Sequence, residues 1–135
     1  MIIVSEIDGK IAGFAEPRSV MIGRRKIGNI LWIAIHPDLR RRGIASALVA
    51  ECLRILSEQE ASLIFVSVEG DNLPAFALFE KNGFKRMSSK ELRREFGLRV
   101  MSLYNKLLIA PHEVVFVRSR NDLDAPSPSK SNQPS

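Results

Sequence analysis

One stretch of the chain, IAIHPDLRRRGIASAL at residues 33–48, decides how we expect the rest to fold. It joins an apolar segment, typical of a buried strand, to the start of a helix through a basic turn that contains Gly43. The first N–H groups of a helix have no partner within the helix and lie at the positive end of its dipole, so an anion placed there gains hydrogen bonds and favourable electrostatics. Arg40, Arg41 and Arg42 add positive charge, and a glycine lets a ligand approach the main chain. The turn therefore indicates a phosphate-binding backbone, with an ordinary strand-to-helix turn and solvated arginines as the alternative.

The turn matches neither of the two common nucleotide-binding patterns, G-x-x-x-x-G-K-[ST] and G-x-G-x-x-G. Residues 40–45, RRRGIA, instead resemble [QR]-x-x-G-x-[GA], the acetyl-CoA-binding motif of the GCN5-related N-acetyltransferase (GNAT) family. A second segment, NLPAFALFEKNGF at residues 72–84, resembles the family's signature N-x-x-A-x-x-L-Y-E-K-x-G-F. The two motifs occur in the family's order. The resemblance covers roughly residues 2–89 and the last predicted strand, whereas residues 90–110 and the tail have no match.

The size and composition of the chain fit one domain. Its 135 residues can bury a core without disulfides or structural metal. We expect a GNAT-type domain at residues 1–120 and a disordered tail at residues 121–135, which is rich in Pro and Ser and lacks the apolar residues needed to pack. No apolar run is long enough to span a bilayer and no signal peptide is evident, so we expect no membrane partner and a cytoplasmic location. The single cysteine, Cys52, has the helical spacing of a core residue.

The net charge of +5 would admit nucleic acid, an acidic membrane or an anionic ligand as a partner. Coenzyme A would account for only part of this charge. The basic residues are dispersed along the chain with little aromatic interleaving, and no nucleic-acid-binding motif is recognisable. Binding to nucleic acid is therefore not favoured.

The pattern of apolar and turn residues predicts an α/β fold. Asp8-Gly9 is a hairpin signal between the first two strands, and residues 30–35 are apolar throughout, which predicts a central strand covered on both faces. We expect strands at 2–7, 10–16, 28–36, 62–68, 84–88 and 113–119, and helices at 42–57 and 73–82. Hairpins and helical crossovers together imply a mixed antiparallel and parallel sheet. By the resemblance this is the GNAT-type sheet without its first strand and the helices that follow, which in the family help to form the acceptor wall.

Residues 90–107 are longer than the usual link between the family's final strands. Their apolar residues share one helical face, and Gly97 is a candidate break in the helix. We consider three roles for this segment: a cover over the acceptor face, a homodimer contact, or an extra core helix that packs on the sheet.

The resemblance also implies which residues bind acetyl-CoA as co-substrate, without a metal. The strand ending at Ile35 would diverge from the strand at 62–68 and open a slot for pantetheine, with the pyrophosphate on the N–H groups of the basic turn. The implied cofactor-binding residues are Ile33, Ala34, Ile35, Arg40, Arg41, Arg42, Gly43, Ile44, Ala45, Ser46, Asn72 and Phe79. Asn72 is also a natural helix cap. Lys81 and Arg86 are candidates for a 3′-phosphate, with solvent exposure as the alternative.

Two residues that move protons in the family are replaced here. Phe79 stands where the signature has the tyrosine that protonates the departing thiolate, and Ser67 stands where many peptide N-terminal acetyltransferases of the family have a glutamate. Such groups contribute about 10²–10⁴-fold to a rate. Glu69 is our preferred substitute as the catalytic residue, because it lies near the expected cleft. The other candidate bases are Asp71, Glu16, His36 and Tyr104.

These observations leave three functional hypotheses. The first is an acetyl-CoA-dependent N-acetyltransferase that acts on a primary amine, either a protein N-terminus or a small amine, by direct attack. An α-amine with a pKa near 7.7–8.0 is easier to deprotonate than a lysine near 10.4 by roughly 3–4 kcal/mol, which favours α-amines in a site without a strong base. The second is a coenzyme A-binding regulatory module that has lost its chemistry. The third is a basic interaction protein on the same scaffold.

Overall fold

The computed structural model describes residues 1–119, so the predicted tail at 121–135 lies outside the described residues. The strands are β1 (Ile3–Ile7), β2 (Lys10–Ile22), β3 (Arg25–Ile35), β4 (Leu63–Glu69), β5 (Lys85–Met87) and β6 (Glu113–Ser119). The helices are α1 (Ile44–Glu58), α2 (Leu73–Lys81), α3 (Ser89–Phe96) and α4 (Val100–Leu107), with short 3-10 turns η1 (Pro37–Leu39) and η2 (Gly97–Arg99).

The strands form one sheet in the order β1-β2-β3-β4-β6-β5. Only β3 and β4 are parallel, and every other neighbouring pair is antiparallel. The predicted mixed sheet is therefore confirmed. The first hairpin turns at Asp8 and Gly9, both with positive φ (52° and 79°), as a two-residue hairpin turn requires.

The β2–β3 hairpin is longer than predicted, because residues 17–22 continue β2 in spite of Pro17. Ala15 pairs with Ile33 but Pro17 pairs with Ile30, so β3 has one extra residue, a bulge, at this point. Proline is tolerated at such an interruption because the regular ladder is already broken there.

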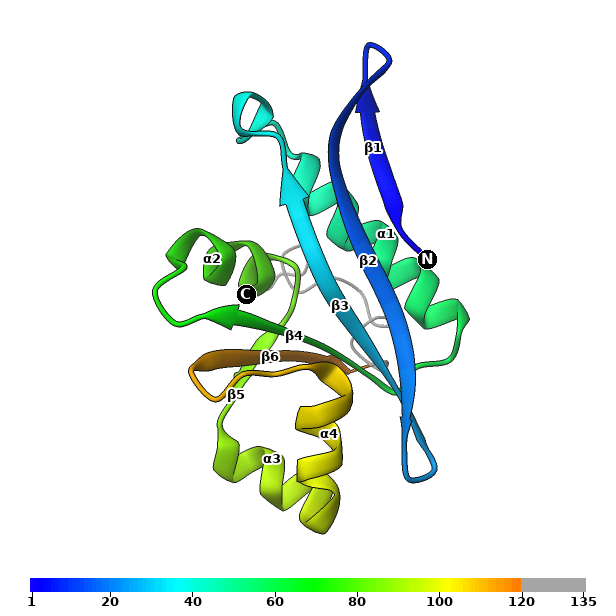
Figure 1. Cartoon of the computed structure of the whole chain (residues 1–135), viewed down its shortest axis with the longest axis vertical. Coiled ribbons are helices and arrows are strands. Elements are labelled where there is room, and N and C mark those ends of the chain that lie inside the picture. Colours follow the sequence, from blue (N-terminus) through cyan, green and yellow to red (C-terminus); the bar gives the residue numbers. More distant parts are fainter. Residues whose placement is uncertain (120–135) are drawn as a thin grey trace, which may run out of the picture.

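The separation of β3 from β4 begins next to this bulge. The two strands pair only over residues 27–29 of β3 and 63–65 of β4. Figure 1 shows them running together at their starts and then separating, with α2 between their arrowheads. The β4-facing edge of β3 beyond Asn29 therefore has no strand partner, and this opening positions the site described below.

Helices cover the two faces of the sheet unequally. On one face, α1 and α2 pack over a core that includes Leu48, Cys52, Phe79 and Phe116. On the other face, α3 and α4 bury the predicted apolar stripe against the sheet. That stripe consists of Leu92, Phe96, Val100, Leu103 and Leu107. Gly97 (φ 57°) ends α3, as the sequence predicted. Residues 90–107 thus form extra core helices, the third of the roles considered.

The expectation that β3 is covered on both faces is wrong for its second half. Trp32 is 60% exposed and Ala34 is also exposed. The reason is that α3 and α4 lie beneath β4 and β6 in Figure 1 and do not extend over the start of β2 or the ends of β1 and β3. Ala34 pairs with Phe14 and Phe14 with Val4, so these exposed side chains share one apolar face.

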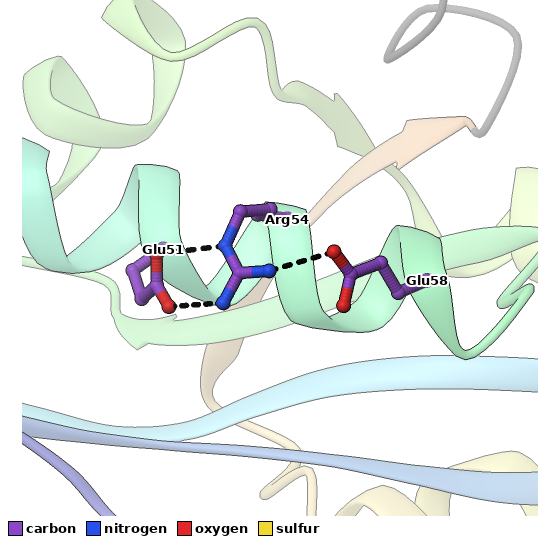
Figure 2. A network of polar contacts seen from close by, with 3 residues as sticks. All are labelled: Glu51, Arg54 and Glu58. Carbon is purple, nitrogen blue, oxygen red and sulfur yellow. Dashed lines mark hydrogen bonds and ion pairs between the residues drawn. The ribbon is translucent and has the colours of Figure 1, made fainter.

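The exposed side of α1 has its own charge network. Figure 2 shows Arg54 between Glu51 and Glu58, with nitrogen–oxygen distances of 2.5–3.0 Å to Glu51 and 2.6 Å to Glu58. The Arg54 guanidinium lowers the pKa of the Glu51 carboxyl. These carboxylates lie at the middle and at the end of the helix, and its first turn has no acidic residue. The positive end of the α1 dipole is therefore not neutralised by its own helix.

Candidate functional site

A cleft of about 360 Å³ opens where β3 and β4 separate. Its walls come from both strands, from the first two turns of α2, and from the end of α4. The residues that line it are Asn29, Ile30, Leu31, Trp32, Ile33, Val66, Ser67, Val68, Glu69, Asn72, Ala75, Leu78, Phe79, Leu107, Leu108 and Glu113. None of them is basic.

A second groove of about 710 Å³ continues from the cleft to the start of α1. The groove and the cleft share Ile33, Ala75 and Leu78, so they form one continuous slot. The groove is lined by Ile33, Ala34, Ile35, Leu39, Arg40, Arg41, Gly43, Ile44, Ala45, Ser46, Pro74, Ala75, Leu78 and Lys81. This end of the slot has three basic side chains and no acidic one.

The local backbone explains why the groove has its shape. The imidazole of His36 accepts a hydrogen bond from the N–H of Asp38 at 3.1 Å and starts the short turn η1. Arg41 and Gly43 then adopt positive φ values of 69° and 77°. Gly43 is the N-cap of α1 and supplies no side-chain cap. The N–H groups of the first turn of α1 are therefore available to an anion in the groove.

The structure brings together most of the residues that the sequence predicted to bind the cofactor. Ile33, Ala34 and Ile35 line the slot from β3, and Arg40, Arg41 and the residues 43–46 line it from the turn and α1. Arg42 is exposed but does not line the groove. Lys81 lines the groove from α2. Arg86 instead stacks over the ring of Phe76 at 4.5 Å.

Asn72 and Phe79 lie at the cleft and also have structural roles. The side chain of Asn72 accepts a hydrogen bond from the N–H of Ala75 at 3.2 Å, which confirms the predicted cap of α2. Phe79 is only 2% exposed and packs against Phe84 and Phe116, with ring centroids at 5.4 and 6.3 Å. Phe79 therefore fills the core and also forms part of the cleft wall.

Two carboxylates line the cleft at the ends of β4 and β6. Glu69 pairs with Glu113 across these strands, and an Oε of Glu69 lies 2.8 Å from Nε2 of His112. Both partners of that contact are more than half exposed. Our sequence reasoning did not identify His112 as a site residue. Its place immediately before the last predicted strand, which must pair beside the strand that carries Glu69, is the signal that could have found it.

The sequence of the chain matches a known protein family. A profile of the acetyltransferase (GNAT) family matches residues 1–84, well over half of the chain. The protein belongs to the GNAT family. The match includes the basic turn, α1 and the whole of the Asn72–Phe84 signature.

Individual relatives agree with this GNAT assignment. The chain is 30% identical over 103 residues to an N-alpha-acetyltransferase of Sulfurisphaera tokodaii, which covers 70% of this chain and 60% of that protein. It is 29% identical over 94 residues to a mycothiol acetyltransferase of Saccharomonospora viridis, covering 64% of this chain and 30% of the relative. The chain thus spans between about a third and three fifths of the length of these curated relatives.

A solved structure shows the same fold at low sequence identity. The PaiA N-acetyltransferase of Thermoplasma acidophilum, crystallised with coenzyme A, has a TM-score of 0.65 and 15% identity. The alignment covers 88% of this chain and 60% of that one. Residues 1–119 therefore include β3 and β4 of a GNAT sheet, together with α1 and α2, the helices that follow them.

Other side chains of this GNAT protein lie outside the cleft. Asp71, Glu16, His36 and Tyr104 do not line it, whereas Ser67 does. Burial raises the pKa of the Cys52 thiol to about 12, so this thiol stays protonated near neutral pH and does not act as a nucleophile. Within residues 1–119 no three His, Cys, Asp or Glu side chains are grouped as metal ligands. No helix in that range has the length and apolar content to cross a membrane.

Proposed function

We propose that this protein is an acetyl-CoA-dependent N-acetyltransferase that transfers an acetyl group to a primary amine, either a protein N-terminus or a small amine. The observation that carries the proposal is the continuous slot between β3 and β4. One end of the slot is a basic groove at an uncapped helix N-terminus, and the other end is a cleft lined by carboxylates. The phosphates of acetyl-CoA match the charge of the basic groove. Its neutral thioester would lie in the cleft, beside carboxylates that can accept a proton from an amine.

The groove supplies contacts for the phosphates of coenzyme A. Backbone N–H groups in the first turn of α1 donate to the pyrophosphate, as oriented dipoles at helix N-termini do. Arg40 and Arg41 add charge from one side and Lys81 from the other. Along β3, the main-chain groups of Ile33 and Ile35 have no strand partner on the β4 side and would pair with the pantetheine amides.

In the reaction, the amine nitrogen forms a bond to the thioester carbonyl carbon, and the carbon–sulfur bond breaks. Glu69 accepts the proton that the amine loses, and His112 at 2.8 Å holds the carboxylate in place. A free N–H on the β4-facing edge of β3 stabilises the developing oxyanion. Phe79 cannot protonate the sulfur, so the thiolate leaves as such. A thiol with a pKa of about 8.5 is a tolerable thiolate leaving group near neutral pH.

The absence of the usual acid and base also bears on the acceptor. A single carboxylate removes a proton more readily from an α-amine than from a lysine, whose pKa is higher by over two units. We therefore expect acceptors with an α-amine to react faster than internal lysines. Comparable acetylation of the two kinds of peptide at pH 7 would contradict this expectation.

The experiment is an assay of thiol release from acetyl-CoA in the presence of a mixed library of peptides and small amines, with products identified by mass. We expect acetylated α-amines and stoichiometric thiol. The double variant Arg40→Glu/Arg41→Glu should weaken acetyl-CoA binding in calorimetry by about 100-fold, because two attractive charges become repulsive at a phosphate site. Arg24→Glu, in the exposed β2–β3 turn, is the matched control and should bind normally.

A coenzyme A-binding module without chemistry is the second candidate. Phe79 and Ser67 favour it, because both replace groups that move protons in the family. Binding of acetyl-CoA with no thiol release for any acceptor would support this candidate. No binding of acetyl-CoA at all would favour a basic interaction protein instead.

The mass of the protein in solution tests whether α3 and α4 form a homodimer contact. The helices α3 and α4 turn their apolar stripe toward their own sheet. The large exposed apolar residues of this segment are Leu98, in the turn η2 between the helices, and Met101, in α4. This distribution favours a monomer at these helices.

A further inference from the structure

Two large apolar side chains line the cleft and are exposed there. Trp32, on β3, is 60% exposed, and Leu108, immediately after α4, is 62% exposed. They are distant in the sequence, and neither belongs to the two hydrophobic cores. Their exposed apolar surface contributes little to folding and is available to a ligand in the cleft.

The backbone at Leu108 strengthens this argument. Leu108 has φ 58° and ψ 40°, the left-handed conformation that ends many helices. Glycine or asparagine is usual at this position, because a Cβ makes the conformation unfavourable. A leucine here adds strain and gains no core packing. Strained residues of this kind are concentrated at functional sites.

Hydrogen bonds hold the end of α4 against the strands beside the cleft. The buried side chain of Asn29 donates to the carbonyl of Leu107 at 3.4 Å. Arg18 donates to the carbonyl of Lys106, and Nζ of Lys106 donates to the carbonyl of Met21 at 2.9 Å. The last carbonyls of the helix, which lack partners within it, are thus tied to β2 and β3. Leu108 is thereby fixed near the strand that carries Trp32.

The charge of the cleft is opposite to that of the protein as a whole. The chain has a net charge of +5, yet the cleft contains Glu69 and Glu113 and no basic residue. A carboxylate pair attracts an ammonium group, whereas exposed tryptophan and leucine side chains attract an apolar one. The cleft therefore combines recognition of a cation with recognition of an adjoining apolar group.

We propose that the acceptor carries its primary ammonium group next to an apolar side chain, as in a peptide whose first residue is large and apolar. Glu69 and Glu113 attract the ammonium, and Trp32 and Leu108 contact the apolar side chain. Trp32 and Leu108 are thus specificity-determining residues of the acceptor site. This inference rests on the proposed function and defines its acceptor.

The test compares two peptides that differ only at the first residue, Leu or Ser, with leucinamide and serinamide as the matched small amines. For the unmodified protein we expect kcat/KM to be at least 10-fold higher for the Leu-first peptide, within the range that an apolar pocket provides. If the Leu and Ser amides show the same ratio, the site recognises the ammonium and side chain alone. If kcat/KM is higher for Leu than for Ser only in the peptides, the acceptor site also contacts the residues that follow the first one.

Two variants separate a structural role of Leu108 from its role in specificity. Leu108→Ala keeps the strained backbone and Leu108→Gly relieves it, so the Gly variant should have the higher Tm. Both should lose most of the Leu-over-Ser preference. Trp32→Ala should lose it as well, and Trp32→Phe should keep part of it. Leu98→Ala is the control, because Leu98 is fully exposed and lines neither the cleft nor the groove.

Binding distinguishes failure of this inference from failure of the proposed function. In calorimetry with coenzyme A present, the Leu-first peptide should bind at least 10-fold more tightly than the Ser-first peptide, and an N-acetylated Leu-first peptide should not bind. Selective binding without turnover would refute the enzyme and retain the acceptor site. The inference would be overturned if turnover or binding showed no preference for Leu. It would also be overturned if the preference survived in Leu108→Gly and Trp32→Ala.

Discussion

The two ends of the slot are built in different ways. The basic groove is formed mainly by one contiguous stretch, residues 33–46, with α2 completing it. The cleft draws on β3, β4, α2, the end of α4 and the start of β6, which are far apart in the chain. A groove at a strand-to-helix turn can thus be encoded by a local sequence, whereas the cleft forms only when distant segments meet.

The largest effect should come from a change that damages only the cleft. Glu69→Gln keeps the shape of the side chain and removes its basicity. We expect kcat to fall by about 100-fold, since a general base contributes about 10²–10⁴-fold. The Kd of acetyl-CoA should be unchanged, because Glu69 does not line the groove. His112→Gln should have a smaller effect of the same kind. An unchanged kcat in Glu69→Gln would show that the proton goes elsewhere.

Asn29→Ala should loosen the end of α4 and so disturb the cleft without disturbing the groove. Asn29 is 3% exposed, and its side chain donates to the carbonyl of Leu107. Loss of this bond leaves a carbonyl without its partner and should lower the free energy of unfolding by about 1–3 kcal/mol. Denaturant unfolding measures this loss. The KM for the acceptor should rise while the Kd of acetyl-CoA stays the same. An equal change in KM and Kd would contradict the view that the cleft and the groove act independently.

Phe79→Tyr tests the wall of the cleft at α2. Phe79 lines the cleft and stands where the family signature has a tyrosine. A hydroxyl that reaches the thioester sulfur should increase kcat by about 10-fold, a cautious fraction of what a general acid provides. Single-turnover kinetics measure the chemical step directly. If the rate is unchanged and the Tm falls, the phenol oxygen is buried in the core instead.

The smallest effect concerns the helix that forms the basic end. The pKa of the Cys52 thiol is raised from 9.0 to about 12 in the folded protein, mainly by burial. The contribution of the protonated Cys52 thiol to the free energy of unfolding is complete below pH 9. It is lost as the pH rises toward 12, because the thiol ionises first in the unfolded chain. At pH 10 the loss should be about 1 kcal/mol. Cys52→Ala should lack this alkaline dependence, and an identical slope in both proteins would exclude Cys52 as its source.

Some differences between prediction and structure have clear physical causes. The second strand was predicted to span residues 10–16, but it continues through Pro17 to Ile22, because the bulge in β3 lies beside Pro17 and removes the need for an N–H there. The apolar run at residues 30–35 predicted burial on both faces, yet Trp32 and Ala34 are exposed. Periodicity measures the apolar character of a strand and does not tell whether another element covers it.

The sequence alone determined the mixed α/β sheet, the two motifs and the groove residues from Ile33 to Ser46. These features depend on neighbours in the chain: a glycine with positive φ, an uncapped helix start and a strand of apolar residues. The tertiary structure decided the cleft. It placed His112 beside Glu69, fixed Leu108 beside the strand of Trp32, and buried most of Phe79 in the core at the cleft wall. Such contacts join residues tens of positions apart, so they depend on how the strands pair and where the helices pack, which local patterns do not specify.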